Sequence, residues 1–97
     1  MAYTVDFTVA AEADLDKIIE WYNQFDVALA NDFLKRMNTV IQDIAKNPLL
    51  TQKIYKSYRK SNISRFPYKL IYRVEKQAII IIAITHHKRN AYWKKSR

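Results

Sequence analysis

Hydrophobic positions along this chain follow a strand period, then a helical period, then a strand period again. Residues 3–9 alternate between apolar and polar, which is typical of a strand with one buried face. Apolar residues then recur three and four positions apart over two stretches, which predicts two helices with one apolar face each. The first stretch has Ala11, Leu15, Ile18, Ile19, Tyr22 and Phe25, with Asp14, Asp16 and Glu20 expected on its polar face, and the second has Ala30, Phe33, Leu34, Met37, Ile41 and Ile44.

The ends of the two helices are predicted by residues with capping preferences. Thr8 and Asp26 each precede a periodic stretch, and their side-chain oxygens can accept an otherwise unpaired backbone N–H. Asn23-Gln24 interrupts the first pattern, and Asn47-Pro48 ends the second because proline cannot continue a helix. The short connection predicts an antiparallel helical hairpin that packs on a sheet.

Three further strands are predicted after the helices. Residues 53–63 are basic and rich in tyrosine, which favours one partly exposed strand, and residues 68–74 alternate after the break at Phe66-Pro67. Residues 78–85 have neither charge nor alternation, so both faces of that strand must be covered. The predicted order is β-α-α-β-β-β. This is a single α+β domain over residues 1–97, with a helical hairpin packed on a mostly antiparallel, four-stranded sheet.

Composition excludes several classes of site. The chain has no cysteine, which excludes disulfides, thiolate zinc sites and cysteine nucleophiles. It has no glycine either, which excludes the glycine-dependent phosphate loops of the Walker and Rossmann motifs. The sequence shows neither a signal peptide nor the ~20 apolar residues of a membrane span, so we expect a cytoplasmic protein with no membrane partner.

Charge is segregated between the two halves of the sequence. Residues 1–47 have four Lys or Arg and eight Asp or Glu, whereas residues 48–97 have thirteen Lys or Arg and one acid, Glu75. The second half is expected to attract a polyanion such as nucleic acid or an acidic protein segment. A basic surface whose only role is solubility is the alternative interpretation.

The strand predicted over residues 78–85 leads directly into a cationic and aromatic tail. Residues 86–97 contain His86, His87, five Lys or Arg, Tyr92 and Trp93. Imidazoles transfer protons near neutral pH, cations contact phosphates, and aromatic rings stack on bases. Structural alternatives stay open: the adjacent histidines line one site only if the strand ends between them, and the two rings would equally well cover the end of the core.

Three runs in the last third carry a resemblance to a known family. They are Phe66-Pro67-Tyr68-Lys69-Leu70-Ile71-Tyr72-Arg73-Val74, residues 79–84, and His86-His87-Lys88-Arg89-Asn90-Ala91-Tyr92-Trp93. Together with the element order of essentially the whole chain, they resemble the RelE/ParE superfamily, the toxins of bacterial type II toxin–antitoxin pairs. Ala91 stands where that family often has proline. The resemblance implies a cognate antitoxin protein that wraps the toxin with an extended and a helical segment.

The resemblance implies one of two activities. RelE-like members cut mRNA on the ribosome without a metal, whereas ParE-like members inhibit DNA gyrase and have no hydrolytic site. By the resemblance, Arg89, Lys69 and Lys60 match phosphate-contacting or basic positions of the family, and Asn62 replaces a second lysine of the nucleases. The dense positive charge favours ribosome-dependent mRNA cleavage as the first interpretation. Gyrase inhibition is the alternative, and a basic RNA-binding module without toxicity is a third.

The predicted site has two sets of residues and no metal or cofactor. The candidate catalytic residues are His87, His86, Arg89 and Tyr92, and the candidate nucleic-acid-binding residues are Lys60, Lys69, Arg73, Lys88 and Trp93. A solvated strand face is an equally good interpretation of Lys69 and Arg73. The expected partners are the antitoxin and the ribosome with its mRNA, or gyrase in the alternative, and the oligomeric state is left open.

Overall fold

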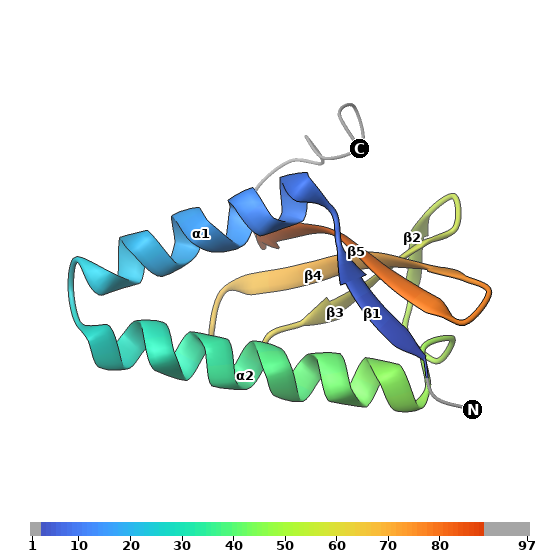
Figure 1. Cartoon of the computed structure of the whole chain (residues 1–97), viewed down its shortest axis with the longest axis horizontal. Coiled ribbons are helices and arrows are strands. Elements are labelled where there is room, and N and C mark those ends of the chain that lie inside the picture. The colour runs from blue at the N-terminus through green and yellow to red at the C-terminus, as the bar shows by residue number, and fades with distance from the viewer. Residues whose placement is uncertain (1–2, 89–97) are drawn as a thin grey trace.

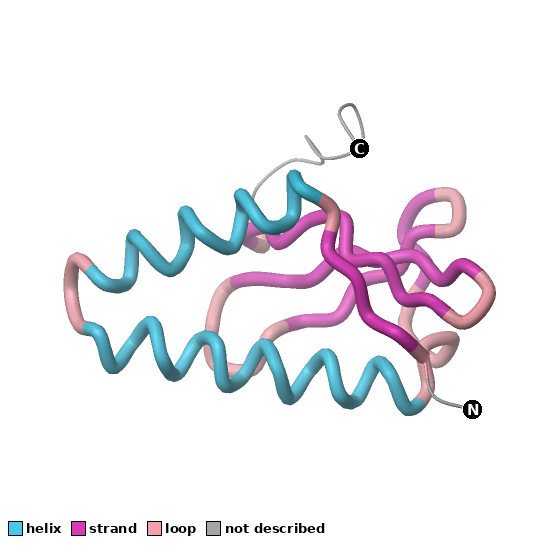
Figure 2. Tube along the Cα trace, in the orientation of Figure 1, coloured by secondary structure: helices cyan, strands magenta, loops and turns pink. Residues whose placement is uncertain are grey.

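The chain folds as a layer of two helices against a mixed sheet. The computed structural model describes residues 3–88. In chain order the elements are β1 (Thr4–Phe7), α1 (Val9–Asn23), α2 (Val27–Lys46), β2 (Lys53–Tyr55), β3 (Tyr58–Asn62), β4 (Tyr68–Glu75) and β5 (Ala78–His86). The two helices run beside each other along one side of the strands (Figures 1 and 2). The predicted fold class, a helical hairpin on a mostly antiparallel sheet, is confirmed.

Both helices begin at the predicted caps. The Thr8 hydroxyl accepts a hydrogen bond from the Ala11 N–H at 3.1 Å, and the Asp26 carboxylate accepts one from the Ala28 N–H at 2.9 Å. Each bond satisfies a backbone donor that the first helical turn leaves unpaired. The expectation for Phe25 was wrong, because α1 ends at Asn23 and leaves this ring 65% exposed in the connection.

The sheet has the strand order β1-β5-β4-β3-β2. The β1–β5 pair is parallel, with Thr4 opposite Ala78 and Phe7 opposite Ile81, and the other pairs are antiparallel. The helical hairpin therefore connects β1, at one edge of the sheet, to β2 at the other edge, and the last strand, β5, lies beside β1. Helix α1 packs on β5, the strand that leads to the tail.

The prediction of four strands was wrong by one. Residues 53–63 form a hairpin of β2 and β3, in which Tyr55 pairs with Tyr58 around the turn at Lys56-Ser57. Lys56 adopts a φ of 51°, in the left-handed region that glycine or asparagine usually occupies. Because neither residue type is present at this turn, the sequence pattern of residues 53–63 predicts one continuous strand.

Strand β5 is buried on both faces, as predicted. Ile79, Ile81 and Ile84 belong to the main core, which includes Phe33, Met37 and other apolar residues of the two helices. Ile82 and Ala83 pack on the opposite face with Ile71, Ile54, Tyr55, Tyr58 and Ile80. A register shift, in which Ile71 pairs with Ala83 and Tyr72 with Ile81, inserts Ile82 as the extra residue of a bulge. The end of β5 is thus fixed by packing from both sides.

Candidate functional site

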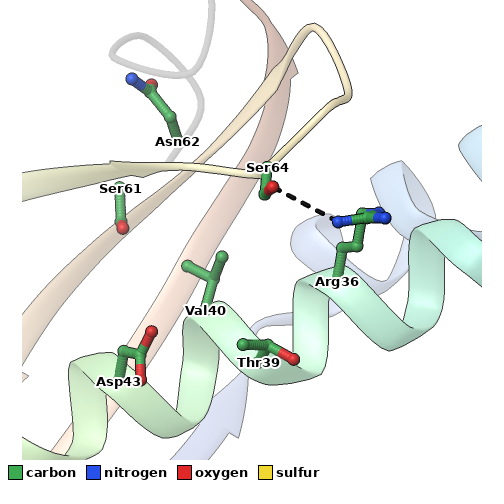
Figure 3. A pocket seen from close by; sticks show the side chains of 7 residues that line it. All are labelled: Arg36, Thr39, Val40, Asp43, Ser61, Asn62 and Ser64. Carbon is green, nitrogen blue, oxygen red and sulfur yellow. Dashed lines mark hydrogen bonds between the residues drawn. The ribbon is translucent and has the colours of Figure 1, made fainter.

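A cationic face lies on the side of the sheet that the helices leave uncovered. Asn62 of β3 is in register with Lys69 of β4, which in turn is in register with Thr85 of β5. Residues in register across a sheet project to the same side, and Lys60 lies two positions before Asn62. Figure 3 shows Asn62 pointing away from α2 while its neighbour Ser61 points toward it. We call Lys60, Asn62 and Lys69 the lysine face.

The two lysines of this face affect each other electrostatically. The pKa of Lys69 is lowered from its ordinary value, chiefly because the ammonium group is partly desolvated and secondly because Lys60 is positively charged. Neither lysine has an ion pair with a carboxylate in the described part of the chain. Two neighbouring cations without a carboxylate form a natural site for an anionic group such as phosphate.

Arg73 lies on the same side of β4 but its charge has a partner. Its Nε donates to the Glu75 carboxylate at 2.8 Å, and Glu75 is the single acid of residues 48–97. Arg73 is two residues after Ile71, which packs with Ile54, Tyr55 and Tyr58 of the β2–β3 hairpin. It is therefore less available than the two lysines for a phosphate.

The two histidines are held by main-chain contacts at the end of β5. The strand ends at His86, and the Nδ1 of His86 accepts the Lys88 N–H at 3.1 Å. The His86 ring packs edge-on against Tyr68 with 5.3 Å between ring centroids. Because Tyr68 packs on the main core under the helices, His86 lies on the opposite side of the sheet from the lysine face.

His87 is exposed and lies in the turn after the strand. Its N–H donates to the Pro67 carbonyl at 2.9 Å, and its Nε2 is 3.1 Å from the Tyr68 carbonyl oxygen. Lys88 is also exposed in this turn. The remaining candidates, Arg89, Tyr92 and Trp93, lie outside the described residues. Within residues 3–88 the structure thus brings Lys60 and Lys69 together and places His86 elsewhere.

Thr85 continues the row of the lysine face but is buried. Its side chain is 2% exposed, and its hydroxyl has no hydrogen-bond partner among the described residues. A buried hydroxyl without a partner is destabilising by about 1–3 kcal/mol. Because threonine is an ordinary strand residue, the burial of this hydroxyl could not be predicted from residue type.

Asp14 has a structural role that the sequence analysis missed. Its carboxylate accepts the Ile84 N–H at 3.0 Å, although 70 residues separate the two in sequence. Strand β1 pairs with β5 only as far as Ile81, so α1 supplies the acceptor beyond that point. Asp14 was assigned to the polar face, yet it lies three residues after Ala11 and four before Ile18, which is the spacing of the buried face.

Tyr72 and Arg59 hold the loop that connects α2 to β2. The buried Tyr72 hydroxyl donates to the Pro48 carbonyl at 2.7 Å and also bonds the Thr51 hydroxyl. The Arg59 guanidinium donates to the carbonyls of Leu49, at 3.0 Å, and Thr51. Burial raises the pKa of Tyr72, while the Thr51 hydrogen bond and the Arg59 charge oppose that rise. Arg59 is thus a structural cation, unlike Lys60 and Lys69.

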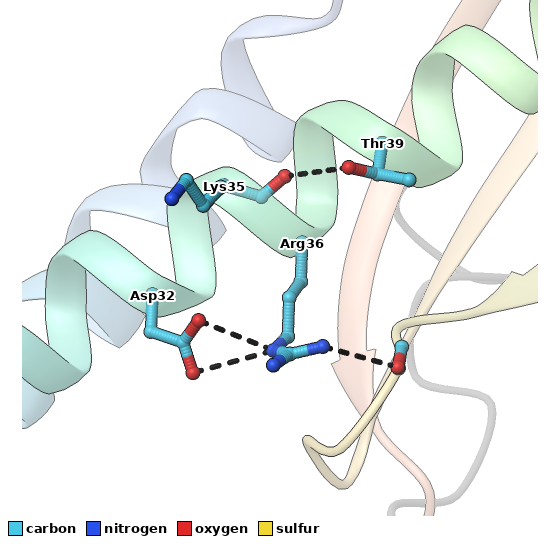
Figure 4. A network of polar contacts seen from close by, with 5 residues as sticks. Asp32, Lys35, Arg36 and Thr39 are labelled. Atoms are coloured by element: carbon cyan, nitrogen blue, oxygen red, sulfur yellow. Dashed lines mark hydrogen bonds and ion pairs between the residues drawn. The ribbon is translucent and has the colours of Figure 1, made fainter.

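A pocket of about 320 Å³ lies between α2 and the end of β3 (Figure 3). It is lined by Arg36, Thr39, Val40 and Asp43 from α2 and by Ser61, Asn62 and Ser64 from β3 and the next loop. Arg36 is anchored at one end, since its Nε contacts the Asp32 carboxylate at 3.2 Å and its Nη1 donates to Ser64 at 3.4 Å (Figure 4). This network joins α2 to the loop after β3.

Two other kinds of feature are absent from residues 3–88. Between residues 3 and 88, no group of three or more His, Cys, Asp or Glu side chains is arranged to hold a metal ion. Neither of the two described helices is both long and apolar enough to cross a membrane.

The family of the chain is shown by a sequence match over most of its length. Residues 5–91 match the family described as the ParE toxin of the type II toxin–antitoxin system parDE. No curated protein matches the chain in sequence.

Three solved structures share the fold. The chain is similar to the chromosomal ParDE system from P. aeruginosa, with a TM-score of 0.75, 19% identity and coverage of 87% of this chain and 95% of that chain. The RelBE2 toxin–antitoxin complex from Mycobacterium tuberculosis has a TM-score of 0.60, 22% identity and coverage of 89% and 92%. The YoeB dimer from Staphylococcus aureus has a TM-score of 0.62, 19% identity and coverage of 88% and 97%.

These comparisons confirm the resemblance to the RelE/ParE superfamily. At identities of 19–22% the structural likeness concerns the fold, whereas the family match extends over nearly all of the sequence. The chain belongs to the ParE toxin family and is a toxin of a type II toxin–antitoxin system.

Proposed function

We propose that this toxin acts by binding its target through the lysine face, and that the target is DNA gyrase. The observation that carries the proposal is the separation of one of the two candidate proton-transfer groups, His86, from the lysine pair. His86, the imidazole packed on Tyr68, lies on the helix side of the sheet, and the lysines lie on the other side. A cleaving site would need its proton-transfer group within hydrogen-bond reach of the reacting phosphate. A binding site needs only the cations.

The match to the ParE branch supports the same target, because ParE-like members inhibit gyrase without hydrolysis. Lys60 and Lys69 would contact anionic groups of the gyrase–DNA assembly. The substitution of Asn62 for a nuclease lysine leaves a neutral amide between the cations, which suits contact better than charge stabilisation of a transition state.

Ribosome-dependent mRNA cleavage is the second candidate. It is supported by the lysine pair without a carboxylate, since this arrangement would also stabilise the developing charge on a scissile phosphate. In that case Arg89 and Tyr92 would complete the site, with His87 as the proton-transfer group.

We also propose a cognate antitoxin as the partner of the basic half. A protein segment that neutralises this surface would be acidic where it covers the lysine face. Co-expression with the product of a small neighbouring reading frame, followed by purification, tests this part. A toxin that is tolerated alone, with no co-purifying partner, would contradict it.

Two assays, one with purified toxin and one with induced cells, separate the candidates for the target. Purified toxin is expected to block supercoiling by gyrase, and induced cells are expected to show no new mRNA ends by primer extension. Replacing Lys60 and Lys69 together by Gln should weaken the block at least tenfold, whereas Lys35→Gln, an exposed lysine of α2, should not change it. New mRNA ends with normal supercoiling would overturn the gyrase proposal. His87→Ala should then lower cleavage by about 10²–10⁴-fold.

A further inference from the structure

The tip of the helical hairpin has an exposed apolar patch. Trp21 near the end of α1 is 54% exposed, Phe25 in the connection is 65% exposed, and Val27 at the start of α2 is 62% exposed. The rings of Trp21 and Phe25 pack edge-on with 5.1 Å between centroids. We call Trp21, Phe25 and Val27 the tip patch. An exposed aromatic pair of this kind is typical of protein–protein binding sites.

The tip patch and the lysine face lie on different layers of the molecule. The tip patch belongs to the helix layer, at one end of the longest axis, whereas the lysine face lies on the side of the sheet away from the helices (Figure 1). The cationic residues used in the proposed function come from β3 and β4 and not from the two helices. A ligand on the tip patch would therefore leave the lysine face accessible.

The acids nearest the tip patch in sequence are Glu20 and Asp26, and the nearest cation is Lys17, four residues before Trp21. Glu20 and Asp26 flank the two aromatic residues in sequence, and both are exposed. Such a rim repels phosphate and attracts cations, so nucleic acid is an unsuitable ligand.

A second exposed apolar pair is flanked by positive and not by negative residues. Leu49 and Leu50, in the loop after α2, are 60% and 80% exposed and lie between Lys46 and Lys53 in sequence. Helix α2 separates them from the tip patch by its 20 residues, or roughly 30 Å. The apolar groups at the two ends are alike, so their charged neighbours decide which partner each end accepts.

We propose that the tip patch is a docking site for a protein partner whose apolar surface is bordered by Lys or Arg. The partner would bury the Trp21–Phe25 pair and place its cations against Glu20 and Asp26. This site is independent of the lysine face, so the toxin can hold an anionic ligand and a cationic protein surface at the same time. The proposal does not depend on whether the target is gyrase or the ribosome.

Trp21 itself reports binding. The sequence has two tryptophans, so the variant Trp93→Phe leaves Trp21 as the single source of tryptophan emission. The probes are two synthetic amphipathic peptides with the same leucine pattern and no aromatic residue, one with lysine and one with glutamate at every polar position. We expect the lysine peptide to give a saturable blue shift of Trp21 emission and the glutamate peptide to give none.

Two substitutions localise the effect. Phe25→Ser should lower the affinity for the lysine peptide about tenfold, because it removes one ring of the pair. Leu50→Ser, the matched control at the basic end, should leave the titration unchanged. Since both side chains are exposed, circular dichroism should show the same fold and melting temperature for both variants.

Three results would overturn the proposal. One is no shift with the lysine peptide, or a shift that Phe25→Ser does not weaken. Another is an equal shift with the glutamate peptide, which would remove the role of the acidic rim. The third is a shift of Trp21 emission with toxin concentration alone, which would identify a second copy of this chain as the occupant of the tip patch.

Discussion

The helical half of this toxin, residues 1–47, and the strand half, residues 48–97, use their charges in different ways. Several acids of the helical half take part in the fold, since Asp26 caps α2, Asp32 pairs with Arg36, and Asp14 accepts the Ile84 N–H. In the strand half, by contrast, Lys60 and Lys69 have no carboxylate partner in the described part of the chain.

This difference separates stability from function. Carboxylates that accept hydrogen bonds at a cap or an uncovered strand edge stabilise the fold. Lysines that repel each other do not, and the pKa of Lys69 is lowered chiefly by desolvation and secondly by the charge of Lys60. Charges that are unfavourable for the free protein are expected where a ligand of opposite sign will bind.

The largest effect is expected when an acid is placed inside the strand half. Ile81 is fully buried in β5, so Ile81→Asp would bury an unpaired carboxylate at a cost of several kcal/mol, comparable with the ~5–15 kcal/mol stability of a typical domain. We expect an unfolded protein by circular dichroism. The control is Val9→Asp, at the exposed first position of α1, where an acid is favourable. A folded Ile81→Asp protein with the wild-type melting temperature would contradict the burial of β5.

Local signals in the sequence were enough to predict the helices. Thr8, Asp26 and Asn47-Pro48 act through neighbouring backbone groups, so their roles follow from residue type and position. The turn at Lys56-Ser57 escaped prediction because a lysine in the left-handed region has no compositional mark. Its conformation is set by the pairing of Tyr55 with Tyr58 on either side.

The site was predictable only in part, because its contacts join distant strands. Lys60 and Lys69 could be selected from charge and from family resemblance, but their mutual repulsion depends on the register of β3 and β4. The register of β4 and β5 likewise decides that His86 packs against Tyr68. No local pattern indicates which side of the sheet an imidazole at a strand end will occupy.

A smaller effect is expected from removing a hydroxyl that the strand half uses structurally. Tyr72→Phe would leave the Pro48 carbonyl and the Thr51 hydroxyl without their buried partner, at a cost of about 1–3 kcal/mol in the free energy of unfolding. Urea denaturation measures it. Tyr22→Phe in the helical half is the control, with an expected change within about 0.5 kcal/mol, since the Tyr22 hydroxyl makes no hydrogen bond to another described residue. Equal losses in the two variants would show that the Tyr72 hydroxyl does not hold the loop.

The smallest effect, and the sharpest test of the comparison, is a gain of stability. Because the pKa of Lys69 is lowered in the folded protein, protonated Lys69 destabilises the fold at neutral pH. Lys69→Met removes a desolvated charge and its repulsion from Lys60. We expect the free energy of unfolding to rise by about 0.5 kcal/mol after allowance for solvent screening, while target inhibition weakens.

The pH dependence of stability tests whether the Lys69 charge is the cause of this gain. In the wild type the unfolded chain keeps the Lys69 proton up to its ordinary pKa of 10.5, whereas the folded protein loses it at a lower pH. The wild type therefore gains stability as pH rises through this interval, and the advantage of Lys69→Met should disappear by about pH 10.5. Lys35→Met, at an exposed position of the helical half, should show neither the gain nor its loss. If Lys69→Met is no more stable at pH 7, or if its advantage persists at pH 11, the lysine face is not strained by its own charge.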